Sequence, residues 1–131
     1  MRRAVLMSAL VVALGAGVLL GGAGSANAGK LLDAAPDAMR NYAQQAGYIL
    51  SSIKVCGGDA EEEAYFRELA RDNLVQLGAD DEDLGFLSFE MEAAARSASP
   101  RKRDCDEDGA VPVASELFMY RNLIEEALKG G

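Results

Sequence analysis

The acidic segment 104–109 contains the residue types that come closest to a chemical site in this sequence. It reads D-C-D-E-D-G, with carboxylates at alternate positions and a glycine after the third. Oxygen ligands at that spacing can converge on a hard cation such as calcium, and glycine permits the sharp turn they need. Val111 also occupies the place of the apolar residue in a loop of this kind. The pattern supports a hypothesis of calcium- or lanthanide-type cation binding by residues 104–116.

This segment resembles the start of an EF-hand loop but departs from that pattern further along. The twelfth position, where a bidentate carboxylate closes the cage, is Ser115, and Glu116 comes one residue late. Pro100 and the basic run 101–103 stand where the incoming helix would be. A solvated acidic turn explains the same residues. Cation binding by this degenerate loop is therefore the alternative function, and no residue is assigned as a metal ligand.

The residue types present do not favour catalysis. The sequence contains no histidine, which excludes Ser-His-Asp and Cys-His mechanisms. Paired carboxylates could in principle serve a glycoside hydrolase. However, the acidic runs 59–63 and 80–83 stand at predicted helix starts, where the helix dipole favours negative charge. We therefore predict that the protein is not an enzyme, with no catalytic residue, no cofactor-binding residue and no cofactor.

Residues 1–28 are typical of a cleavable signal peptide. A short basic stretch precedes an apolar run over 4–20, and Ala26 and Ala28 form the A-x-A pattern that signal peptidase accepts. An uncleaved membrane anchor is the alternative, but the apolar run is shorter than the roughly 20 residues of a spanning helix. The two arginines also resemble a twin-arginine signal, although ordinary signals share that feature. We predict cleavage before Gly29 and a periplasmic or secreted bacterial protein without stable membrane insertion.

The remaining residues, 29–131, form one strongly acidic domain by this interpretation. The chain has 13 basic and 21 acidic residues, and the signal segment removes two arginines and no acid, so the net charge changes from −8 to −10. Such a surface is poorly suited to nucleic acid, and we predict that none is bound. It suits solubility, cations or a basic protein partner, and solubility alone is sufficient to explain it.

The two cysteines, Cys56 and Cys105, are predicted to form a disulfide. An even pair in an oxidising compartment is most simply joined, and two cysteines allow one intramolecular pairing. The bond would close a loop of about 50 residues. A chain-entropy model predicts that closing such a loop stabilises the folded state by about 4 kcal/mol. A redox-active pair is the alternative, but the sequence lacks a C-x-x-C motif.

Helical periodicity recurs four times after the predicted signal peptide, and patterns typical of strands are nearly absent. Apolar residues three and four apart predict helices over 36–54, 59–77, 81–97 and 112–128. Asp59 and Glu62 form a capping box at the start of the second helix. Residues 29–35 are expected to be a loose lead-in and 97–113 an irregular loop. The predicted fold is all-α: a single small four-helix domain stapled by one disulfide.

The apolar stripes of these helices are expected to form the core. They include Tyr65 and Leu69 in the second helix and Phe89 in the third. Phe118 and Met119 are the exceptions, because the last helix buries a different stripe, and an exposed pair would suit a partner surface. We therefore predict a small exported protein that acts by protein–protein interaction, as an accessory subunit, inhibitor or chaperone-like factor. Its partner would be another protein of the periplasm or cell envelope.

Overall fold

The computed structural model describes residues 29–130, so the predicted signal peptide of residues 1–28 lies outside the described residues. The helical elements are α2 Lys30–Ala34, α3 Pro36–Val55, α4 Ala60–Val75, α5 Asp81–Ser97, the short 3-10 helix η1 Lys102–Cys105, and α6 Glu107–Gly130. Residues 29–130 contain no strand. The predicted all-α class, with four long helices and one disulfide, is confirmed. Within this range, no helix combines the length and apolar character needed to cross a membrane.

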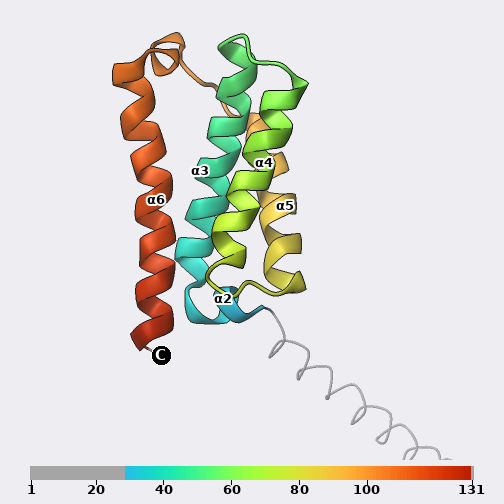
Figure 1. The fold of residues 1–131 in the computed structure, drawn as a ribbon, viewed down its shortest axis with the longest axis vertical. Coiled ribbons are helices and arrows are strands. Elements are labelled where there is room, and N and C mark those ends of the chain that lie inside the picture. Colours follow the sequence, from blue (N-terminus) through green and yellow to red (C-terminus); the bar gives the residue numbers. More distant parts are fainter. Residues whose placement is uncertain (1–28, 131) are drawn as a thin grey trace, which may run out of the picture.

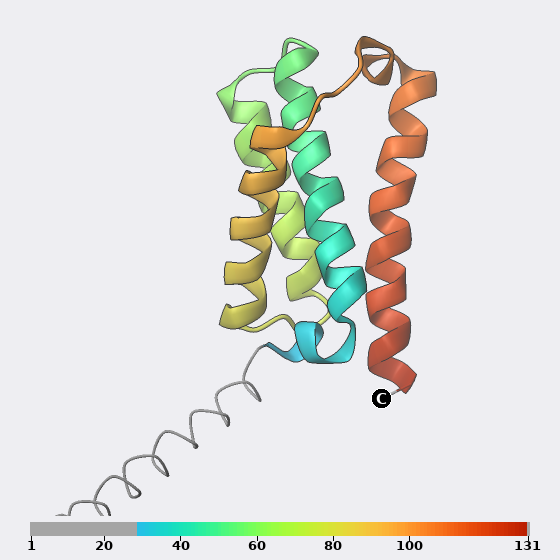
Figure 2. The same cartoon turned by 180° about the vertical axis from the view of Figure 1, so that it is seen from behind.

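Helix α3 is the centre of the domain. Helices α4 and α5 pack on it from one side and α6 from the other, so α3 lies between them in both views (Figures 1 and 2). Helix α6 packs on α3, α2 and η1 but makes no comparable packing with α4 or α5. Its fully covered side chains are Leu117 and Ile124, and Gln45 of α3 donates a 2.9 Å hydrogen bond to the Val113 carbonyl. Helix α6 is therefore held along one stripe.

The core follows the helical stripes that meet α3. Its larger members are Leu31, Met39, Tyr42, Leu50, Phe66, Leu74, Leu87, Met91, Leu117 and Ile124. The hydroxyl of Tyr42 donates to the Ala70 carbonyl at 2.8 Å and accepts from the Asn73 amide at 3.4 Å. Burial raises the pKa of Tyr42 to about 12, with the Asn73 hydrogen bond and the Arg121 charge partly opposing the rise. A neutral phenol thus joins α3 to α4.

Gly47 allows the closest approach between α3 and α5. A Cβ at this position would lie 2.5 Å from the Met91 carbonyl oxygen and 2.6 Å from the Ala94 Cβ. Both distances are far shorter than a van der Waals contact, so the two backbones could not pack this closely around any larger residue. The glycine therefore sets the spacing of the tightest helix pair in the domain.

We expect Gly47→Ala to lower the free energy of unfolding by about 2 kcal/mol, because α5 must move away from α3 to admit the methyl group. Gly85→Ala is the matched control, since a Cβ at Gly85 would meet open space. That change should instead raise stability by about 0.5–1 kcal/mol through helix propensity. Urea denaturation of both variants measures the two effects. A Gly47→Ala protein as stable as the wild type would contradict the close approach.

The expectation of a loose lead-in at residues 29–35 is wrong. These residues include the helix α2, and Leu31 is fully buried in the core. The reason is a carboxylate distant in sequence: fully buried Asp83 accepts the Leu31 N–H at 3.0 Å and the Leu32 N–H at 3.0 Å. Asp83 also accepts the backbone N–H of Asp80 at 3.1 Å. One side chain therefore caps both α2 and α5.

The expected irregular loop over 97–113 is also mostly helical. Residues 102–105 form η1, and α6 begins at Glu107 rather than near Pro112. The Asp106 carbonyl accepts the N–H groups of Gly109 and Ala110 at 3.0 and 2.8 Å, so the first turn forms upstream of the proline. The predicted start of the last helix at Pro112 is therefore wrong. Pro112 lies inside α6 instead.

Candidate protein-binding face

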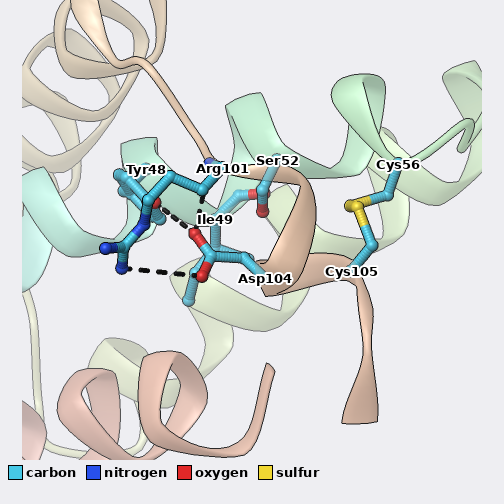
Figure 3. Close-up of a disulfide and its surroundings, with 7 residues drawn as sticks. All are labelled: Tyr48, Ile49, Ser52, Cys56, Arg101, Asp104 and Cys105. Carbon is cyan, nitrogen blue, oxygen red and sulfur yellow. Dashed lines mark hydrogen bonds and ion pairs between the residues drawn. A yellow bond between two sulfur atoms is a disulfide. The ribbon is translucent and has the colours of Figure 1, made fainter. Parts of the chain in front are cut away.

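The predicted disulfide between Cys56 and Cys105 is present and joins the end of α3 to the end of η1 (Figure 3). The two Cα atoms are 5.4 Å apart, which lies in the usual range for a disulfide. The segment between α5 and α6 is therefore attached covalently to the central helix. The bond anchors the end of the domain where α6 begins.

Asp104 lies beside this disulfide and is buried against α3 (Figure 3). Its carboxylate accepts hydrogen bonds from the Tyr48 hydroxyl and from the Arg101 backbone N–H, and the Arg101 guanidinium lies 3.7 Å from its other oxygen. The Tyr48 hydrogen bond is the main reason that the pKa of Asp104 is held below its ordinary value. Asp104 therefore anchors η1 to the fold.

The geometry around residues 104–116 does not resemble a calcium loop. Residues from Glu107 onward are helical, and Asp104 is already engaged by Tyr48 and Arg101. Asp106, Asp108 and Glu116 share an open hollow of about 520 Å³ with Arg101 and Arg103, whose charge opposes cation binding. In the described residues, no group of three or more His, Cys, Asp or Glu side chains is placed to hold a metal ion. Cation binding by residues 104–116 therefore rests on the sequence pattern alone.

The two acidic runs serve helix starts, as the sequence predicts. Asp59 accepts the Glu62 N–H at 2.9 Å, and Glu62 accepts the Asp59 N–H at 3.3 Å, which completes the capping box of α4. The same reciprocal arrangement links Asp80 and Asp83 at α5. Hydrogen bonding from the Asp83 backbone is the main reason for a lowered pKa at Asp80. These carboxylates therefore have structural partners.

An exposed apolar flank runs along α4, contrary to the predicted core. Helix α4 meets the core through Phe66, Ala70 and Leu74, which are four residues apart. Tyr65 and Leu69 precede two of these positions by one residue, so they lie on the side of the helix and are 72% and 39% exposed. The apolar arc of α4 is wider than the surface that α3 and α5 cover. Tyr65 and Leu69 are thus surface residues.

These two side chains border a hollow of about 400 Å³ that is open to solvent. Its apolar lining comes from Ile53 of α3 and from Tyr65, Phe66 and Leu69 of α4. Its rim consists of three carboxylate residues, Asp59, Glu61 and Glu62. We call these seven residues the acid-rimmed hollow. No lysine or arginine is among them.

Helix α6 presents more exposed apolar surface. Phe118 and Met119 are 46% and 48% exposed, which confirms that the pair points outward. Val111 and Leu123 of the same helix are also exposed, at 58% and 50%. Part of the α6 surface is therefore apolar and open to solvent.

Phe89 of α5 was predicted to lie in the core, and this prediction is wrong. It is 68% exposed, while Leu87 and Met91 are buried. The apolar residues of α5 form two stripes, and the buried one contains Leu87 and Met91, four positions apart. Phe89 does not line the acid-rimmed hollow. Phe89 is consequently a useful control position.

Comparison of the chain with protein-family models, curated proteins and solved structures gives no match.

Proposed function

We propose that this protein is a small exported acidic factor that acts by binding another protein, and that the acid-rimmed hollow is its binding site. The observation that carries the proposal is the exposure of Tyr65 and Leu69 beside a hollow floored by Ile53 and Phe66. Tyrosine beside an apolar pocket is typical of the anchors that dominate protein interfaces. Removing such a side chain from water on binding contributes about 1–2 kcal/mol.

The surface of α6 supports the same proposal. Its residues Val111, Phe118, Met119 and Leu123 are each at least 46% exposed. Scattered exposed apolar residues are ordinary, but several large ones on one helix that packs by a single stripe favour a further contact. These residues would therefore give a partner further apolar surface to contact.

Export outside the cytoplasm is the second part of the proposal. A disulfide between Cys56 and Cys105 suits an oxidising compartment, because cytosolic thiols are kept reduced. Gly29, the first residue after the predicted cleavage site, is buried in the described structure.

Cleavage can be checked by expressing the whole chain in a bacterium and isolating the protein from the periplasm or the medium. We expect an intact-mass measurement to give a chain that begins at Gly29 and contains no free thiol. Ala28→Arg should block cleavage, because the signal peptidase pocket accepts small residues at that position. A full-length cytoplasmic protein with reduced cysteines would contradict export.

The binding site can be tested with a photo-crosslinking amino acid placed at Tyr65 and, as a matched control, at Phe89. Both positions are highly exposed aromatics, at 72% and 68%, on different helices. We expect irradiation of the exporting cells to yield an adduct of one defined mass from position 65 and little from position 89. Tyr65→Ser should remove the partner in co-purification, whereas Phe89→Ser should not. Equal adducts at both positions, or none, would contradict the proposed site.

A further inference from the structure

We infer that the acid-rimmed hollow recognises a basic amphipathic helix: an apolar side chain of the partner enters the hollow while its lysine or arginine residues lie against the acidic rim. The inference rests on the proposed function and adds the chemistry of the partner. It is carried by the joint presence of an apolar floor and an acidic rim at one place on the surface.

The apolar part fits a side chain better than a whole small molecule. The volume of about 400 Å³ is near the lower limit for small-molecule pockets, and the hollow is open rather than enclosed. Ile53 and Phe66 form its inner surface and Leu69 borders it. A leucine or phenylalanine from a partner helix would contact all three residues. Tyr65 would then cover that side chain from the solvent side.

The rim supplies negative charge that has no basic partner within residues 29–130. Asp59, Glu61 and Glu62 form no ion pair there, whereas the next residue, Glu63, lies 3.8 Å from Arg67 on the α5 side of α4. Asp59 and Glu62 accept only backbone N–H groups of their own capping box, which leaves each with free oxygen lone pairs. A cation placed one helical turn from the anchor would meet these oxygens.

The helical form of the partner follows from the fold. The described residues contain no strand, so no sheet edge can be extended by a partner strand. An apolar hollow between exposed helix flanks is instead typical of helix-in-groove recognition. A second copy of this protein is disfavoured as the occupant, because two acidic rims would face each other. The net charge of −10 on each processed chain would also oppose association of two copies.

The test uses the processed chain, which begins at Gly29, and three labelled synthetic helical peptides. The peptides share an apolar face with leucine at i, i+3, i+4 and i+7, and their polar faces carry lysine, glutamine or glutamate. Fluorescence anisotropy measures the Kd of each at low and physiological salt. We expect the lysine peptide to bind about tenfold more tightly than the glutamine peptide, because a few exposed ion pairs together provide a difference of about this size. Salt should reduce this advantage.

Two double variants locate the charge effect. Glu61→Gln with Glu62→Gln removes two rim charges and keeps a residue that can complete the capping box. Asp81→Asn with Glu82→Gln makes the same charge change at the start of α5, outside the hollow. We expect the first variant to lose most of the lysine-peptide advantage and the second to keep it. Tyr65→Ser should weaken all three peptides, and melting curves check that each variant is folded.

The outcomes separate the inference from the proposed function. Equal affinity for the three peptides, or equal losses in the two double variants, would overturn recognition of basic residues by this rim. Failure of every peptide to bind would also overturn it, even if the position-65 crosslink forms, and the proposed binding site would then stand alone. If the crosslink itself is absent, the proposed function fails independently of the peptide results.

Discussion

Replacing Cys56 and Cys105 together with serine is expected to lower the free energy of unfolding by about 4 kcal/mol. The disulfide joins residues 49 positions apart, and its loss frees a long loop in the unfolded chain. Both cysteines are exposed, so serine leaves no buried cavity or unpaired hydroxyl. A domain of this size has a total stability of roughly 5–15 kcal/mol, so the bond would account for about a quarter of it or more.

Thermal and urea denaturation measure this effect, with and without a reducing agent. We expect a fall in Tm of about 15 °C or more for the double variant. The reductant should destabilise the wild type to the same level and leave the variant unchanged, which is the internal control. Hydrogen exchange should show the greatest loss of protection in α6, because that helix packs by one stripe and begins at the disulfide. A variant within about 1 kcal/mol of the wild type would show that the bond is not the main staple.

Asp83→Ala is expected to lower the free energy of unfolding by about 3 kcal/mol. The fully buried carboxylate accepts backbone N–H groups from Leu31, Leu32 and Asp80. Alanine would leave these donors without their acceptor. The Leu31 N–H is buried, and an unsatisfied buried group costs about 1–3 kcal/mol before relaxation. Loss of the reciprocal bond of the α5 capping box, from the Asp80 N–H to the Asp83 side chain, adds to the effect. Helix α2 should detach, because its five residues are too few to be helical alone.

Asp81→Ala provides the control for this prediction. Asp81 is exposed in the same first turn of α5, so the variant removes the same charge beside the same helix dipole. It should cost less than about 1 kcal/mol. Urea denaturation compares the two, and limited proteolysis near residues 29–35 reports detachment of α2. Equal stability of the two variants would mean that the Asp83 hydrogen bonds contribute little.

The long helices were largely predictable because their signals are local. The helix predicted over 36–54 is observed as Pro36–Val55, and the capping box of Asp59 and Glu62 is present where its spacing indicates. Capping and apolar periodicity act within one or two helical turns, so a short window of sequence contains them. The disulfide was predictable for another reason, since only two cysteines are available to pair.

Helix α2 and the early start of α6 beside η1 were not predictable from local signals. Helix α2 depends on a hydrogen bond between residues 52 positions apart, and its own five residues contain no cap or sustained stripe. The early start of α6 depends on η1 packing against it: a Cβ at Gly109 would lie 2.1 Å from the Arg103 carbonyl oxygen. Local propensity at Pro112 suggested a later start, and tertiary packing overrode it.

For the candidate binding site, the sequence by itself determined which residues are apolar and which are acidic, and that the acids stand at a helix start. Only the tertiary structure decided that Tyr65 and Leu69 are exposed while Phe66 is buried. These residues all lie within one broad apolar arc of α4. The sequence of this helix by itself does not determine which of them become buried. The selection comes from its neighbours: α6 packs on α3 instead of on α4, so one flank of that arc is left open to solvent above Ile53.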